Sequence, residues 1–171
     1  MINDRLDVIG IGNAMVDAFI QTTKAEVENN NLNRDSMNLI DEDLKNKLHE
    51  KYSIKDLVGG GSVGNSMFGI TSFGGNGSFI GKIKNDKIGK FLQEDMIQEG
   101  LKFPLGFTSP VVSTGCCTIF VEKDGTRTMC TYLGAGTLIG PKDIKEEDVK
   151  NHQIAYLEGY LWDNEKAKQA M

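Results

Sequence analysis

The glycine-rich stretch at residues 58–67, VGGGSVGNSM, has the residue types and spacing of a ligand-binding loop. Gly59, Gly61 and Gly64 match the G-x-G-x-x-G pattern of dinucleotide-binding loops. The same stretch also matches a P-loop in which Asn65 replaces the lysine. A third possibility is that these glycines hold a sugar and not a phosphate. The stretch therefore leaves three kinds of ligand open.

Both phosphate interpretations have a specific weakness. Asn65 cannot supply the positive charge that the P-loop lysine brings to the β- and γ-phosphates. A dinucleotide-binding loop needs a buried parallel strand before Gly59 and an acidic residue after the next strand. Asp86 meets the second condition, but Lys55 and Asp56 lie where the buried strand is needed. A phosphate is therefore the less favoured ligand.

A neutral diol fits the local chemistry better. The amide of Asn65 offers both donors and acceptors, and glycines let backbone N–H groups approach a ligand closely. Asn13 and Asp17 follow the first strand-like segment, where ligands of open α/β sheets bind. A carboxylate accepts strong, charge-assisted hydrogen bonds from hydroxyl groups. Together these residues predict a polyol site, although each alone is also typical of a turn or an exposed strand.

The elements that must position these residues alternate along the chain. Apolar patterning predicts strands at 6–13, 15–22, 36–40, 77–83 and 154–162, and helices at 24–31, 42–52, 65–73 and 86–99. Asp41 is a predicted N-cap and Gly100 a predicted C-cap. Alternating strands and helices predict an α/β fold with a doubly wound, mostly parallel sheet covered by helices.

Residues 101–133 break this alternation, because they carry strand signals only. Asp124 and Gly125 lie at the centre of a predicted hairpin turn. We expect this hairpin to form a small sheet with the strands at 15–22 and 36–40. The helix that begins near residue 163 has no strand after it, so we expect a fragment of a longer chain with an exposed hydrophobic sheet edge.

Composition narrows the class of protein. A chain of 171 residues favours one domain, and its net charge of −5 argues against a nucleic-acid surface. The sequence has neither an apolar run of membrane-spanning length nor a secretory leader, so we expect no membrane contact and a cytoplasmic location.

Cysteines and histidines are few. Cys116, Cys117 and Cys130 form no disulfide framework, and two histidines, His49 and His152, make a dedicated metal site improbable. We expect small core thiols and solvated imidazoles, with no metal bound.

Several longer segments resemble a known family. VIGIGNAMVD, GGGSVGNSMFGITSFGGNGSFIGKIKNDKIG and YLEGYLWD resemble the N-terminal half of pfkB, ribokinase-type carbohydrate kinases. MNLID, RTMCTYLGAG and EGYLWD are most similar to bacterial adenosine-kinase-like members. The resemblance covers residues 7–163. It departs at Val63, Met67 and Lys84, which bears on the substrate more than on the family.

The resemblance implies a domain organisation and a reaction. Residues 1–171 would be an incomplete ribokinase-like α/β core, with lid strands at about 15–22, 36–40 and 101–133 and the C-terminal nucleotide-binding half missing. The family transfers the γ-phosphoryl group of ATP, with Mg²⁺, to a primary hydroxyl of a nucleoside such as adenosine or of a sugar. Either a monomer or a lid-mediated dimer is compatible with it.

The family's general base is the last residue of a D-x-x-G-A-G-D motif. The Gly134-Ala135-Gly136 segment lacks both aspartates, so the base is absent and we expect no kinase activity from this chain alone. Fructokinase or ribokinase specificity, a non-catalytic nucleoside-binding module and, less favoured, an NAD-binding Rossmann domain remain alternatives.

The resemblance also implies roles for individual residues. The hydroxyl-binding and pocket-shaping residues would be Asn13, Asp17, Gly60, Gly61, Ser62 and Asn65. The apolar contacts to a nucleoside base would be Met15, Met37, Leu39, Met129 and Leu133, each of which is alternatively an ordinary core residue. Arg127 would lie near the transferred phosphate, or else would be a cross-strand partner of Glu122.

Overall fold

The protein is described by a computed structural model that covers residues 6–104 and 106–171. The strands are β1 (Leu6–Ile11), β2 (Met15–Gln21), β3 (Met37–Leu39), β4 (Asp56–Gly60), β5 (Gly77–Ile80), β6 (Ile83–Lys84), β7 (Phe107–Ser109), β8 (Gly115–Val121), β9 (Arg127–Tyr132) and β10 (His152–Leu157). The α-helices are α1 (Lys24–Asn29), α2 (Glu42–Lys51), α3 (Ser62–Ser72), α4 (Lys87–Gln98), α5 (Glu146–Lys150) and α6 (Glu165–Ala170). Three 3₁₀ turns are η1 (Gly134–Leu138), η2 (Pro141–Asp143) and η3 (Gly159–Leu161).

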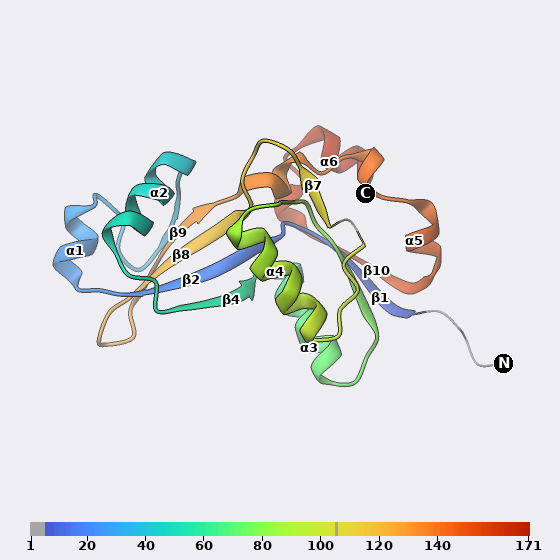
Figure 1. The fold of residues 1–171 in the computed structure, drawn as a ribbon, viewed down its shortest axis with the longest axis horizontal. Coiled ribbons are helices and arrows are strands. Elements are labelled where there is room, and N and C mark those ends of the chain that lie inside the picture. The colour runs from blue at the N-terminus through green and yellow to red at the C-terminus, as the bar shows by residue number, and fades with distance from the viewer. Residues whose placement is uncertain (1–5, 105) are drawn as a thin grey trace.

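Two sheets divide the molecule along its longest axis (Figure 1). One is a parallel three-stranded sheet with the order β10-β1-β5, and the other is a five-stranded sheet with the order β3-β9-β8-β2-β4. A short turn between β1 and β2 carries the chain from the first sheet into the second. The α/β class and the mostly parallel core sheet predicted from the sequence are confirmed.

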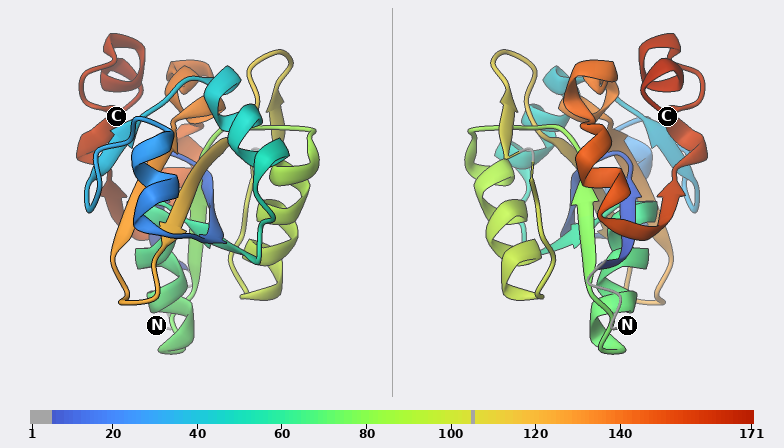
Figure 2. Two further views of the ribbon diagram at one scale, coloured as in Figure 1. Left: turned by 90° about the vertical axis from the view of Figure 1, so that its left-hand side faces the viewer. Right: turned by 90° about the vertical axis from the view of Figure 1, so that its right-hand side faces the viewer.

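Helices cover both faces of the three-stranded sheet, and α4 and α6 lie on opposite sides of it (Figure 2). Residues of alternate parity along β1 supply the two cores. Val8 packs with residues of α3 and α4, whereas Ile9 and Ile11 pack with Ile139 and Ala167 on the other face. This two-sided burial is typical of a doubly wound sheet.

Glycines in and after β1 let α3 approach closely. A methyl group at Gly10 would lie 2.5 Å from a methyl of Val63 and 2.9 Å from the side chain of Met67, and one at Gly12 would lie 2.8 Å from Val63. Val63 and Met67, the two departures from the family pattern on this helix, are fully buried against these glycines. The core therefore accommodates the side chains of Val63 and Met67.

The five-stranded sheet combines the predicted hairpin with the early strands. β8 and β9 pair antiparallel, and Gly125 between them has a φ of +86°. β8 also pairs parallel with β2, and β3 pairs parallel with β9. Helices α1 and α2 lie beside these strands (Figure 1) and bury one face of the sheet.

Two strand expectations differ from the structure. The strand signals at 101–109 give only β7, which pairs with β6 in a separate ladder. The core strand expected at 154–162 is β10, which ends at Leu157 and leads into η3. Within the described residues β10 pairs with β1 alone, so Ile154, Tyr156 and Leu157 stay exposed. The prediction of a buried core strand is therefore wrong for its side chains.

The histidine expectation is also wrong. His152 is buried, its Nε2 lies 2.8 Å from Ser78 Oγ and its Nδ1 lies 2.6 Å from the carbonyl oxygen of Asp148. His49 is half-buried, with Nε2 2.8 Å from Thr118 Oγ1. Ser78 and Thr118 are distant in sequence from the histidines that they contact, so local polarity gave no sign of burial. The three cysteines are buried free thiols, as expected.

Candidate functional site

Antiparallel pairing of β2 with β4 brings the glycine-rich loop beside β2, the strand that follows β1. Met15 pairs with Gly60, and Asp17 pairs with Val58. A methyl group at residue 60 would lie 2.6 Å from the Asp17 carboxylate, so only glycine permits this approach. The structure thus places Gly60 directly against Asp17, two residues that lie far apart in the sequence.

Gly61 joins the loop to α3 and also contacts the turn between β1 and β2. Its φ is +86°, a conformation that favours glycine, and a methyl group there would lie 2.8 Å from the carbonyl oxygen of Asn13. Ser62 and Asn65 follow in the first turn of α3 with exposed side chains. Asn13, Asp17, Gly60 and Gly61 therefore converge, and Ser62 and Asn65 continue from them along the helix.

Asp17 is the electrostatically perturbed residue of this group. Burial raises the pKa of its carboxyl from 3.8 to about 6, and the positive charge of Arg127 opposes the rise. At neutral pH the carboxyl is still mostly ionised. A partly desolvated carboxylate beside a glycine loop is well suited to accept hydrogen bonds from ligand hydroxyl groups.

Asn13 is held tightly but is not fully satisfied. Its side chain is 3% exposed, and Oδ1 is buried without a hydrogen-bond partner among the described residues. Gly136 of η1 packs so closely that any side chain there would overlap the Asn13 amide. A buried acceptor without a donor costs free energy, and such groups concentrate at functional sites.

The apolar residues of the prediction share one face of the five-stranded sheet. Strand register places Met37 beside Met129 and Leu39 beside Thr131. The buried part of this face contains Met15, Cys117 and Ile119, with partly buried residues around it: Phe19, Val121, Met129 and Leu133. Met37 and Leu39 are 51% and 65% exposed at its margin. We call this surface the open face, because α1 and α2 cover the other one.

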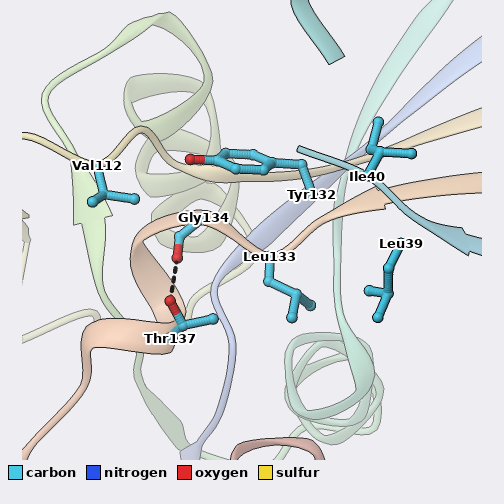
Figure 3. Close-up of a pocket in the computed structure, with 7 residues that line it drawn as sticks. All are labelled: Leu39, Ile40, Val112, Tyr132, Leu133, Gly134 and Thr137. Carbon is cyan, nitrogen blue, oxygen red and sulfur yellow. Dashed lines mark hydrogen bonds between the residues drawn. The ribbon is translucent and has the colours of Figure 1, made fainter. Parts of the chain in front are cut away.

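A hollow of about 290 Å³ borders the open face where β3 and β9 end (Figure 3). Leu39 and Leu133 are the predicted site residues in its wall. The remaining lining residues are Ile40, Val112, Tyr132, Gly134 and Thr137. Its lining is mainly apolar, and the Thr137 hydroxyl donates to the Gly134 carbonyl oxygen at 2.8 Å.

Arg127 begins β9 with an exposed side chain, and Glu122 has a different partner. Arg34 Nε donates to Glu122 Oε1 at 2.7 Å, and Arg34 Nη2 donates to Oε2 at 3.2 Å. The expectation that Arg127 pairs with Glu122 is therefore wrong. Strand register places Arg127 beside Val121 on the open face, and its positive charge opposes the rise in the pKa of Asp17.

The surroundings of the glycine loop contradict a dinucleotide-binding arrangement. The strand before the loop, β4, is an antiparallel edge strand and not a buried parallel one, which explains the exposed Lys55 and Asp56. Asp86, the candidate ribose-binding acid, caps α4 through the N–H of Gly89 at 2.7 Å and accepts from Thr114 at 2.9 Å. The loop therefore lies in a different structural context from the one an NAD site requires.

Within residues 6–104 and 106–171, no group of three or more His, Cys, Asp or Glu side chains is arranged to hold a metal ion. No helix in the same part of the chain is long and apolar enough to span a membrane.

Comparison with known proteins agrees with the fold. The pfkB family carbohydrate kinase domain matches residues 28–170. The chain belongs to the pfkB family. Among curated proteins none matches it.

Solved structures of pfkB-like kinases share the fold of the chain. A probable sugar kinase from Rhizobium etli CFN 42 is 33% identical with a TM-score of 0.86, over 98% of this chain and 51% of that one. An adenosine kinase from Sinorhizobium meliloti is 36% identical with a TM-score of 0.86, over 97% and 51%. An adenosine kinase from Schistosoma mansoni in complex with adenosine is 23% identical with a TM-score of 0.79, over 92% and 48%, and shows the fold alone. The chain spans about half the length of these kinases.

Residues beyond those predicted also contact the site of this pfkB-family chain. Cys117 pairs with Asp17 across β2 and β8, and its Sγ lies 3.4 Å from Thr131 Oγ1. Gly136 packs on Asn13, and Glu158 accepts a hydrogen bond from the Asn13 N–H. Period-two spacing shows which residues of one strand share a face. It does not show which distant segments meet, so the sequence pattern gave no signal for Cys117, Gly136 and Glu158.

Proposed function

We propose that this chain binds the phosphoacceptor of an ATP-dependent kinase, a nucleoside such as adenosine or a related sugar whose primary hydroxyl receives the phosphoryl group. The observation that carries the proposal is the convergence of Asn13, Asp17, Gly60 and Gly61 at the edge of an open apolar sheet face. The whole reaction belongs to a protein about twice as long as this chain, by the length of its relatives.

The chemistry of these residues suits a ribose-like ligand. The ionised Asp17 carboxylate accepts hydrogen bonds from two neighbouring hydroxyl groups, and the Asn65 amide both donates and accepts. Glycines 60 and 61 leave no side chain between the backbone and the ligand. Ser62 and the buried Asn13 complete the polar side of the pocket.

The open face favours a nucleoside over a simple sugar. A flat base packs on thioether and leucine side chains, and Met37, Leu39, Met129 and Leu133 present such groups beside the Asp17 row. A free hexose has no apolar ring face of comparable area and would leave Met37 and Leu39 exposed. Adenosine is therefore our first choice, with fructose and ribose as the competing acceptors.

Arg127 and the cofactors complete the proposal. The Arg127 guanidinium, close enough to Asp17 to affect its pKa, would offset negative charge on a phosphoryl group transferred to the acceptor. The described residues do not themselves fit Mg²⁺ or ATP, because they offer no cluster of metal-ligating side chains and no lysine in the glycine loop. We assign ATP, Mg²⁺ and the general base to sequence outside these 171 residues.

Isothermal titration of the purified chain with adenosine, ribose and fructose tests this function. We expect adenosine to bind, and Asp17→Ala or Asn65→Ala to weaken binding by roughly 100-fold and 10-fold, because charged hydrogen bonds are the stronger ones. Asp43→Ala, an exposed carboxylate on α2, is the matched control and should bind as the wild type does. Unchanged affinity in both site variants would refute the site.

A turnover assay separates the enzyme proposals. The chain alone should form no phosphorylated acceptor from ATP, whereas the longer protein should do so with the preferred acceptor. Acceptor-dependent product from the 171-residue chain would show that the base lies within it. Nucleoside binding without turnover by the longer protein would identify a non-catalytic binding module.

A further inference from the structure

Glu158 is a buried carboxylate next to the proposed acceptor site. It directly follows β10, is 5% exposed, and donates its backbone N–H to the carbonyl oxygen of Ile11 at 3.1 Å. Among the ion pairs of the described residues, none involves Glu158. A carboxylate kept out of water without a cation needs other hydrogen-bond donors, which here come from the backbone.

The donors belong to two separate segments of the site. Glu158 Oε2 accepts the N–H of Asn13 at 3.3 Å. A methyl group at Gly12 would lie 2.6 Å from the same oxygen, so the turn can approach only as glycine. The same methyl group at Gly12 would lie 2.9 Å from the Cβ of Val63, so the Glu158 carboxylate and the first turn of α3 lie against the same glycine. Burial raises the pKa of Glu158, and the nearby backbone N–H groups of Asn13 and Val63 oppose this rise.

The contact with Val63 matters because α3 has no cap of its own. The first N–H groups of a helix need acceptors, which an N-cap side chain usually supplies. The N-cap of α3 is Gly61, which has no side chain, and no larger residue fits there because the Asn13 carbonyl is too close. Glu158, at the end of a distant strand, places its negative charge beside this first turn, at the positive end of an 11-residue helix.

We propose that Glu158 is a positioning residue for the acceptor site, which clamps the Gly12–Asn13 turn to the first turn of α3. This inference rests on the function proposed above. One side chain thereby fixes the distance between the two walls of the pocket: Asn13 on one wall, and Gly60 and Gly61 on the other. Glu158 does not contact the acceptor itself, and it acts through the backbone of both walls.

Glu158→Gln tests the clamp with little change in volume. The amide keeps an acceptor oxygen but loses the negative charge that faces the Asn13 N–H and the positive end of α3, so the hydrogen bond to Asn13 should weaken. We expect the dissociation constant for adenosine to rise about tenfold, the loss expected for one buried hydrogen bond. Glu158→Asp, which retracts the carboxylate by one methylene, should give a similar loss.

Glu122→Gln is the matched control, because Glu122 is also a buried carboxylate but pairs with Arg34 in the five-stranded sheet. It should leave adenosine affinity unchanged. A purely structural role for Glu158 would lower the melting temperature and leave the affinity of the folded protein unaltered. That outcome overturns the proposal.

Hydrogen exchange gives a second measurement that needs no ligand. The amides of Asn13 and Val63 should exchange markedly faster in Glu158→Gln than in the wild type, while amides of β8 keep their protection. If the wild type binds no acceptor, the proposed function fails, and the clamp is then tested by hydrogen exchange alone. Unchanged exchange at both amides overturns it.

Discussion

The two faces of the five-stranded sheet come from the same strands but differ in what covers them. One face packs Ile20, Phe120 and Cys130 against residues of α1, α2 and the segment between them. The open face carries Met15, Cys117 and Ile119 from the alternate positions of β2 and β8, with Asp17 among them. No helix of the described chain covers this second set (Figure 1).

On this one sheet, the covered face contributes to stability and the open face is available for binding. Apolar side chains on the covered face are removed from water by the protein itself and contribute to folding. Those at the margin of the open face, such as Met37 and Leu39, remain exposed and can gain burial only when a ligand arrives. The carboxylate of Asp17, on the same face, can orient such a ligand by accepting hydrogen bonds from its hydroxyl groups. The comparison therefore predicts that substitutions on the two faces affect different measurements.

Phe120→Ala should give the largest effect on stability. Phe120 is fully buried, and its ring packs edge-on against Tyr52 with centroids 5.2 Å apart. Truncating it leaves a cavity under α2, so we expect the free energy of unfolding to fall by about 3–5 kcal/mol. Urea denaturation measures this loss. Adenosine affinity of the remaining folded protein should be unchanged.

Phe19→Ala is the counterpart on the open face of the same sheet. Phe19 is only partly buried there, so we expect a loss of roughly 1 kcal/mol. Equal losses for Phe19→Ala and Phe120→Ala would mean that both faces are closed in solution, and would remove the distinction between them.

Much of the fold could be predicted from the sequence because its signals are local. Apolar periodicity located most of the strands and helices, and Asp41, the predicted N-cap, accepts a hydrogen bond from the backbone N–H of Leu44. Gly60 of the loop and Asp17 lie against each other, as the hydroxyl-binding hypothesis requires. Whether they bind an acceptor stays a prediction.

What the sequence could not provide was the pairing of distant segments. Lys55 and Asp56 indicated that no buried parallel strand precedes the loop, but not that β4 runs antiparallel beside β2. Arg34 and Glu122 are 88 residues apart, and nothing local marks them as partners. By contrast, the exposed apolar residues of β10, at the edge of its sheet within the described residues, match the exposed hydrophobic sheet edge expected from the sequence.

The pH dependence of binding tests Asp17, the carboxylate on the open face beside the glycine loop. With a pKa of about 6, Asp17 is mostly ionised at pH 7 and mostly protonated at pH 5. A protonated carboxyl accepts hydroxyl hydrogen bonds poorly, so adenosine affinity should fall about tenfold between these values. Cys117 pairs with Asp17 across β2 and β8 and stays neutral over this range, because burial raises the pKa of its thiol to about 11.

Asp17→Asn is the control for the pH profile. It should bind adenosine weakly, with no change in affinity between pH 5 and pH 7.

The same variant also allows the contribution of Asp17 to folding stability to be measured as a function of pH. Because the pKa of Asp17 is raised on folding from 3.8, its stabilising contribution is present below about pH 4 and is lost as pH rises through 6. At pH 8 the variant should therefore be more stable by about 1–2 kcal/mol, allowing for solvent screening. A wild-type profile as flat as that of the variant would place the hydroxyl contacts elsewhere.

Leu39→Ala should give the smallest effect and locates the margin of the open face. Leu39 is 65% exposed, so its loss should change the free energy of unfolding by less than about 0.5 kcal/mol. A base packed on β3 would lose part of its contact, and adenosine affinity should fall about threefold, as expected for a partly buried methyl pair. Ribose, which has no base, should bind the wild type and Leu39→Ala equally.

The control is Ile97→Ala on α4, which also removes an exposed aliphatic side chain. It should change neither the adenosine affinity nor the ribose affinity. If adenosine also binds Leu39→Ala with full affinity, the base does not reach β3, and the ligand-binding part of the open face narrows to β2, β8 and β9, where Met129 and Leu133 are the remaining apolar contacts.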